Sequence, residues 1–360
     1  MAAVNGRWLV VLLAAAALVV TPLALGARPA VASDVAAPEL AHRVQRSGAA
    51  AWSGYVESTG TLQVPDSDSF ANLAQLLGED NDLRVWWRGA DDWRVDRIRS
   101  TGETDLFRRG GASIRWVFES ETATVAPVST IRLPDASDLL PPTLGRSLLQ
   151  GVRPEELVRL PARRVAGVDA PGLRLTPDQP AASVDHVDLW ADPESGLALR
   201  VDLYGPGDVR PLLSTTLRTL DLGLPPESTT LFVPPDDVTV NYDDSVDVAA
   251  SANAFAPFDL PATLAGLPSR DGTDPGAVGI YGRGPTTVLA LPLRGQVARP
   301  LRERLRASAT ATDSALGTLA PLGPVSLLVT RDRGRGALLL AGTVTPETLE
   351  RAARQLGTAS

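Results

Sequence analysis

Between Leu83 and Phe118, hydrophobic and polar side chains alternate with a period of two. This alternation predicts β-strands with one apolar face and one charged face. The segments between the strands are short, with GADD at 89–92 and Gly110-Gly111. Short connections indicate an antiparallel meander, because parallel neighbours need long crossovers. The pattern therefore predicts a curved antiparallel sheet with a tryptophan-rich apolar face that something must cover.

The rest of the chain supplies more strands and few helices. A hairpin is predicted at 184–204, where Asp192-Pro193 begins the turn and Gly196 provides the positive φ that reverses the chain. Short helices are predicted at 38–50, 70–77, 141–149 and 154–160. We expect a first domain over 33–235, an acidic linker over 236–256 and a small α+β domain over 257–360.

The N-terminus has the pattern of an export signal. Arg7 precedes the apolar run Trp8–Gly26, and Ala30-Val31-Ala32 offers the small residues that a signal peptidase reads. We therefore interpret 1–32 as a signal peptide, with an uncleaved anchor as the alternative because the run is almost long enough to span a bilayer. Both interpretations predict an extracytoplasmic protein, either secreted or membrane-anchored.

Composition excludes several kinds of chemistry. The formal net charge of −8 and the lack of a basic face argue against nucleic acid as a partner. All 34 basic residues are arginines, which is typical of a GC-rich genome and excludes any mechanism that needs a lysine. The 360 residues contain no cysteine, so disulfides, thiolate metal sites and a lipid-modified cysteine are excluded.

No catalytic or metal-binding motif is evident. His186 and Asp188 share a strand face, but a solvated outer face explains them more simply than a metal site. The acidic stretches at 79–82 and 243–247 lack the pattern of an EF-hand loop. We expect no cofactor, no metal and no enzymatic activity; an envelope hydrolase with a carboxylate pair is the alternative, because the separation of two carboxylates depends on the fold.

The apolar sheet face is the candidate binding site. Either the few short helices fill the space above it, or it lines a hydrophobic cavity for an acyl chain or another apolar ligand. The predicted lining residues are Val85, Trp87, Trp93, Val95, Ile114, Trp116, Phe118, Val187, Leu189, Leu199, Val201 and Leu203.

Several stretches together resemble one superfamily. The hairpin Leu189–Arg200 resembles an element of the LolA lipoprotein carriers and the RseB/MucB regulators of sigma-factor pathways. Trp52–Val56, Leu83–Val95 and Gly172–Pro177 fit the same resemblance in order and spacing, and the tail around Ser326–Arg331 resembles the smaller C-terminal domain of RseB. The alanine- and arginine-rich composition would suit an actinobacterial-like member, in which the partners known from Gram-negative bacteria need not exist.

The resemblance implies a half-open β-barrel that short helices close around a hydrophobic cavity, followed by an α+β module. It implies a lipid-like ligand and, in the regulatory version, the extracytoplasmic part of an anti-sigma factor or another membrane protein as partner. The alternative is a lipid or lipoprotein carrier of the cell envelope. Association with a membrane surface is compatible with both.

Overall fold

The fold is taken from a computed structural model. It describes residues 29–62, 71–128, 132, 134–235, 238–242, 260–270, 278–332 and 336–358, together with Trp8, Val11 and Ala14. Most of the predicted signal peptide and most of the predicted linker lie outside these residues. Among the described helices, none combines the length and the apolar character needed to cross a membrane.

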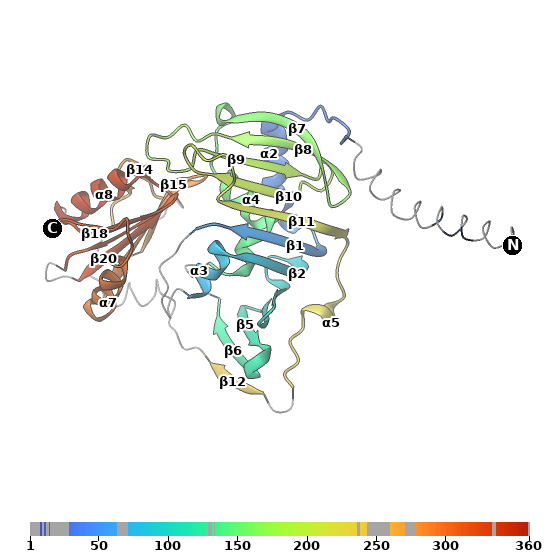
Figure 1. Cartoon of the computed structure of the whole chain (residues 1–360), viewed down its shortest axis with the longest axis horizontal. Helices are drawn as coiled ribbons and strands as arrows, with labels where there is room; N and C mark the ends of the chain where they lie inside the picture. Colours follow the sequence, from blue (N-terminus) through green and yellow to red (C-terminus); the bar gives the residue numbers. More distant parts are fainter. Residues whose placement is uncertain are drawn as a thin grey trace.

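The first domain is built on one large sheet of twelve strands (Figure 1). The strands of the meander are β1 (Trp52–Gly60), β2 (Asp80–Gly89), β3 (Asp92–Arg99), β4 (Gly102–Arg109), β5 (Ala112–Val117) and β6 (Thr122–Pro127). The remaining strands are β7 (Leu157–Val165), β8 (Val168–Leu175), β9 (His186–Ala191), β10 (Ala198–Tyr204), β11 (Leu213–Leu222) and β12 (Thr239–Tyr242).

The sheet is open and almost entirely antiparallel. Its order is β12-β6-β5-β4-β3-β2-β1-β11-β10-β9-β8-β7, so β1 and β11 join the two halves, and β12 and β7 form the edges. Only β12, which runs parallel to β6, departs from the antiparallel pattern among the described strands. The predicted meander is confirmed. Within the predicted linker 236–256, Thr239–Tyr242 form β12 and pair with β6.

Short helices cover one face of the sheet, which we call the core face. The described helices of this domain are α2 (Ala37–Arg46), α3 (Ala71–Gly78), α4 (Pro141–Leu149) and α5 (Glu227–Thr230), with 3-10 turns η1 (Ser47–Ala49), η2 (Phe118–Ser120), η3 (Ala136–Leu139) and η4 (Pro154–Glu156). The hydrophobic side of α2 contributes Leu40 and Val44, both fully buried, to a single core that also contains Val95 of β3 and Leu189 of β9. Because both halves of the sheet reach this core, the sheet bends around the helices.

Two close contacts show how tightly the core is packed. Trp87 and Trp93 are cross-strand partners whose rings stack with centroids 5.6 Å apart. At Gly145 of α4, an added Cβ would lie 2.9 Å from the Ala198 Cβ and 3.0 Å from the Leu189 Cδ1. Helix α4 can therefore approach β9 and β10 this closely only because residue 145 has no side chain.

The prediction of a helix over 154–160 is wrong beyond residue 156. Residues 157–165 form β7, which pairs with β8 around a two-residue turn, Ala166-Gly167, with φ of +49° and +81°. Positive φ at both positions is the geometry that suits a tight hairpin. The pairing with β8 therefore overrides the local helical pattern.

The second domain is a smaller sheet with two helices beside the first domain (Figure 1). Its six-stranded sheet has the order β15-β16-β20-β19-β18-β17. The elements are β13 (Thr263–Leu264), β14 (Leu267–Pro268), β15 (Gly279–Arg283), β16 (Thr286–Leu293), α7 (Gly295–Leu305), β17 (Thr312–Asp313), β18 (Gly317–Leu322), β19 (Val325–Thr330), β20 (Ala337–Gly342) and α8 (Pro346–Thr358). Helices α7 and α8 both pack on this sheet.

Candidate ligand-binding site

Nine of the twelve predicted lining residues lie in the packed core of the first domain. They are Val85, Trp87, Trp93, Val95, Val187, Leu189, Leu199, Val201 and Leu203. Val95, Leu189, Leu199 and Val201 have no exposed surface at all, so a ligand could reach them only if the covering helices moved. A ligand-binding role for these nine residues stays a prediction, and it would require that opening.

The other three predicted residues do not face this core. Trp116 and Ile114 belong to a separate cluster on the opposite face of the sheet, which we call the outer face, and Phe118 is 63% exposed. The reason is the register of the Gly110-Gly111 turn, which pairs Leu106 with Arg115 and Phe107 with Ile114. Residues paired across two strands point to the same face, so Arg115 lies on the core face with Leu106. Its hydrophobic neighbours Ile114 and Trp116 lie on the outer face.

A cavity of about 220 Å³ lies farther along the core face, over β3 to β6. Leu76 of α3 and Ala136 of η3 form part of its wall, together with Leu106 of β4. The polar lining includes Arg97, Thr104, Ser113, Arg115, Thr124 and Asp135. The free space in the sheet therefore lies beyond the tryptophans and is considerably more polar than the sequence predicted.

Two arginines, Arg97 and Arg115, line the cavity. Only 5% of Arg97 is exposed. Burial lowers the pKa of its guanidinium to about 10, and the positive charges of Arg99 and Arg115 act in the same direction. The negative charge of Glu79 acts in the opposite direction. Arg115 is exposed and forms no ion pair within the described part of the chain. Among the described lining residues the carboxylate is that of Asp135, which lies 3.0 Å from Arg132 and is therefore already paired.

The sequence carries a signal for Arg97. Trp93 and Val95 occupy the alternate positions of β3 that are apolar, and Arg97 occupies the next of these positions. A charged residue at an apolar position of a half-buried strand indicates an unusual site. Arg115 had no such signal, because its direction depends on the register of the Gly110-Gly111 turn.

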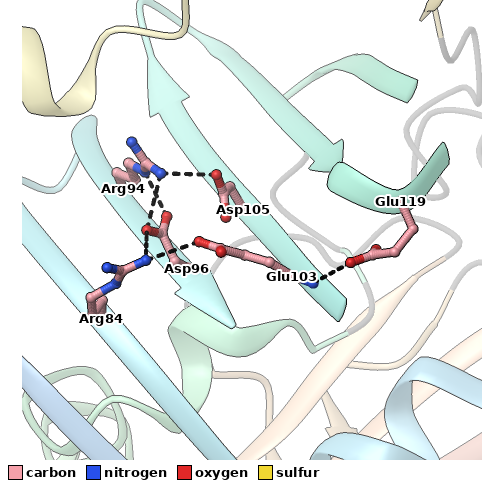
Figure 2. A network of polar contacts seen from close by, with 6 residues as sticks. All are labelled: Arg84, Arg94, Asp96, Glu103, Asp105 and Glu119. Carbon is pink, nitrogen blue, oxygen red and sulfur yellow. Dashed lines mark hydrogen bonds and ion pairs between the residues drawn. The ribbon is translucent and has the colours of Figure 1, made fainter. Parts of the chain in front are cut away.

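The outer face of the same strands carries a network of charged side chains (Figure 2). Arg94 lies 2.5 Å from an Asp96 carboxylate oxygen and 2.9 Å from one of Asp105. Arg84 lies 3.0 Å from Glu103 and 3.5 Å from Asp96. Both guanidiniums also lie near the Trp86 ring, at 5.8 Å for Arg84 and 5.2 Å for Arg94.

This network has the composition of a structural ion-pair cluster rather than a metal centre. Asp96, Glu103 and Asp105 bring carboxylate oxygens within 4.8 Å of one another, but Arg84 and Arg94 contact all three of these carboxylates. Burial, followed by the charge of Asp96, raises the pKa of Asp105 to about 7. The pKa of Asp96 is also raised, again chiefly by burial. Ionisation of either of these two buried carboxyls therefore makes ionisation of the other less favourable.

The histidine that the sequence placed near a carboxylate has other partners. Nδ1 of His186 lies 2.6 Å from Asp185, and the imidazole ring stacks on Tyr204 with centroids 4.3 Å apart. Asp188 instead accepts two hydrogen bonds from Arg174, at 2.6 and 2.8 Å. His186 and Asp188 thus do not form a ligand pair.

A buried ion pair connects the two domains. Glu156 of η4 is paired with Arg283 at the end of β15 and also accepts the backbone N–H groups of Arg153 and Asp178, both at 2.8 Å. Burial alone would raise the pKa of Glu156, but these hydrogen bonds outweigh it and the pKa is lowered. The Gly284 N–H also donates to the Gln150 carbonyl at 2.7 Å.

Comparison with known proteins finds similarity in structure but not in sequence. The sequence matches no family model and no curated protein. The chain is similar in structure to MucB. In the complex of MucA and MucB from Pseudomonas aeruginosa, the match has 16% identity and a TM-score of 0.47, covering 88% of this chain and 96% of that chain. A MucB structure solved alone gives 15% identity and a TM-score of 0.44, with the same coverage.

A second kind of protein matches about half of the chain. A LolA-superfamily protein from Nitrosomonas europaea matches with 14% identity and a TM-score of 0.25, covering 55% of this chain and 98% of that chain. These solved structures include MucB and a LolA-superfamily protein, the two kinds of protein that the sequence resembles.

Proposed function

We propose that this chain is a non-enzymatic binding protein that works outside the cytoplasm, as a regulator of the RseB type. In this proposal the open sheet corresponds to the half-open barrel of those proteins, and the cavity over β3 to β6 holds a lipid-like ligand. The second domain helps to bind the extracytoplasmic part of a membrane protein, such as an anti-sigma factor. The apolar run Trp8–Gly26 and the Ala30-Val31-Ala32 site support export.

The observation that carries the proposal is the cavity on the core face. It lies between strands β3 to β6 of the meander and the elements α3 and η3, and its lining combines apolar and charged groups. A mixed lining of this kind is typical of sites that hold a ligand by area and orient it by a few polar groups. Figure 2 shows that the charges on the outer face of the same strands contact one another, so they serve the fold rather than a ligand.

The two-domain arrangement supports the regulatory version over simple carriage. The domains are joined by Glu156–Arg283 and by the Gly284 N–H to Gln150 hydrogen bond. The segment 181–183 of the first domain adds further contacts, since Ser183 Oγ donates to the Pro324 carbonyl and the Thr345 N–H donates to the Ala181 carbonyl. Two arrangements of the domains about this junction would differ in these contacts. A ligand can shift such an equilibrium only by its different affinity for the two arrangements, so the ligand and the protein partner would have to be coupled through this junction.

The test is binding to a defined partner. The mature chain, beginning at Ser33, is titrated by calorimetry with the purified extracytoplasmic segment of the anti-sigma factor encoded nearest to its gene. We expect a one-to-one complex whose affinity changes when the chain has first been stripped of lipid with solvent. If this segment does not bind and the chain instead transfers lipid between vesicles, the carrier alternative replaces the regulator.

A further inference from the structure

Helix α7 covers the face of the second sheet that is turned away from the first domain. The apolar residues of this helix pack on Val329 and Leu339. Leu328 and Leu340, the neighbours of these residues along the same strands, point to the opposite face and pack there with α8 and with Ala181 of the first domain. Helix α7 therefore lies on the outside of the molecule, as Figure 1 shows.

Arginines gather on one side of this helix. Arg299, Arg302 and Arg306 are spaced by three and four residues, which places them on a common side of α7. Arg306 directly follows the helix, and its backbone keeps helical angles, with φ of −61° and ψ of −23°. We call these three residues the arginine stripe. Arg331 lies near it, because Asp313 interacts electrostatically both with Arg306, at 2.7 Å, and with Arg331.

The carboxylates beside the arginine stripe do not neutralise it. Glu303 lies 3.3 Å from Arg299, and Asp313 pairs with Arg306, but all four of these side chains are at least 44% exposed. Ion pairs between exposed groups are weak, because water competes for both partners. Within the described part of the chain, Arg302 forms no ion pair. The stripe therefore keeps its positive charge toward solvent.

This positive charge is a local property of the second domain. From Arg294 to Arg306 the sequence has five arginines and one glutamate, whereas the whole chain has a formal net charge of −8. Asp313 and Asp332, which lies near the start of α7, reduce the local charge without reversing it. Charges are screened beyond about 10 Å at 0.1 M salt, so the acidic residues of the first domain do not cancel this surface at contact distance. The fold thus brings together a basic face that the overall composition does not show.

A basic face of this kind fits an anionic membrane surface. Clusters of about four to eight arginines or lysines on a helix are attracted to anionic lipid head groups. The apolar side of α7 is buried in the domain, so the helix can lie on head groups but cannot insert into the acyl chains. Its convex surface suits an extended layer of head groups better than a peptide, which is usually held in a groove or at a sheet edge.

We infer that the second domain binds to a membrane surface rich in anionic phospholipid head groups, through Arg299, Arg302 and Arg306. The inference goes beyond the proposed function, which makes no use of α7. Because the proposed partner is a membrane protein, this contact would hold the chain at the surface where that partner lies.

The test measures binding to vesicles. The mature chain beginning at Ser33, which lacks the apolar run, is mixed with vesicles of phosphatidylcholine alone or with about 30% phosphatidylglycerol, and the bound fraction is measured by sedimentation. At about 50 mM NaCl, we expect the anionic vesicles to bind the chain at least about tenfold more tightly than the neutral ones. At about 500 mM NaCl this preference should disappear, because salt screens the attraction.

Variants assign the binding to the arginine stripe. Arg302→Gln should weaken binding to anionic vesicles about fivefold, and Arg299→Gln together with Arg302→Gln about twentyfold. Arginine and glutamine have similar helix propensities, so α7 should tolerate these changes. Arg302→Lys keeps the charge and should bind as the wild type does. Arg46→Gln is the matched control, because Arg46 is exposed at the end of α2 in the first domain and forms no ion pair among the described residues. It removes the same charge and should leave binding unchanged.

Three results would overturn the inference. If neutral vesicles bind as tightly as anionic ones, or if Arg46→Gln weakens binding as much as Arg302→Gln, the stripe does not select the surface. If polyglutamate or duplex DNA binds and the vesicles do not, the face recognises a soluble polyanion and the membrane is wrong. If none of these probes binds, the stripe has no anionic partner. Each of these results leaves the proposed function standing, because its own test uses a soluble protein segment and no vesicles.

Discussion

Asp96 and Arg97 are consecutive residues of β3 whose side chains point to opposite faces of the sheet. Arg97 lines the cavity on the core face, and Asp96 accepts hydrogen bonds from Arg94 on the outer face. Less than 6% of either residue is exposed. A single strand therefore carries one buried charge assigned to a binding site and, next to it, one assigned to a structural network. Substitutions can separate these two roles.

The outer network should make stability depend on pH. The pKa of Asp105 is raised from 3.8 to about 7, first by burial and then by Asp96. A carboxyl whose pKa is higher in the folded state favours folding in its protonated form, so this contribution is complete below about pH 4 and is lost as the pH rises through about 7. We expect the urea midpoint to fall between pH 6 and pH 8.

The variant Asp105→Asn shows whether Asp105 causes this dependence. An amide cannot ionise, so the decline in urea midpoint between pH 6 and pH 8 should become smaller than in the wild type. Because Asp96 and Asp105 titrate as a pair, the measured midpoint belongs to both. An undiminished decline in the variant would show that another group titrates in this range.

The tryptophan pair should be structural. Trp87 is 6% exposed and stacks on Trp93 in the packed core. Trp87→Ala should lower the free energy of unfolding by about 3–5 kcal/mol, as expected for the loss of a large buried aromatic side chain. Phe118→Ala is the control, because Phe118 is mostly exposed and should change stability by less than about 0.5 kcal/mol.

Denaturant unfolding of both variants gives the comparison. If Trp87→Ala costs less than about 1 kcal/mol but changes ligand uptake, then Trp87 lines an open cavity. The sequence prediction of a tryptophan-lined site would then be right, and the packed core would not be the resting arrangement.

The domain junction should depend on Glu156. This side chain is 1% exposed and pairs with Arg283 across the junction. Glu156→Gln removes the charge that balances a largely buried guanidinium, and breaking a buried pair in this way is strongly unfavourable. We expect faster amide hydrogen exchange at Gly284, whose N–H donates across the same junction.

Glu155→Gln, at the neighbouring position, is the control, since Glu155 is exposed and forms no ion pair across the junction among the described residues. Its exchange rate at Gly284 should equal that of the wild type. Equal protection in the Glu156→Gln variant would show that the other contacts hold the junction together without this ion pair.

The sequence predicted the fold where the local pattern decides it. Helices 37–46 and 141–149 and the meander from 80 to 127 follow from periodicity and turn residues. The local pattern predicts a helix at 157–160, whereas the structure has a strand there. The pairing with β8 that makes it a strand is a tertiary contact, which a local pattern does not contain. In the same way, Phe232 packs on Phe107 of the outer face at a centroid distance of 5.2 Å, a contact between residues far apart in sequence.

The candidate site was predicted only in its general position. The core face of the meander is where the sequence placed a binding site, but the direction of every side chain in β5 depends on the register that Gly110-Gly111 sets. With that register, Arg115 replaces Trp116 on the core face. Pattern alone cannot fix such a register, because a shift of one residue exchanges the two faces of a strand.

Native mass spectrometry of the protein purified from its own cell envelope tests the central claim most directly. We expect a mass that exceeds that of the bare chain by one amphiphile at near-stoichiometric occupancy, and that returns to the bare mass after solvent extraction. Arg115→Gln purified in the same way should carry much less of this species. A bare mass before and after extraction, together with a tryptophan emission that added lipid does not move, would contradict the account.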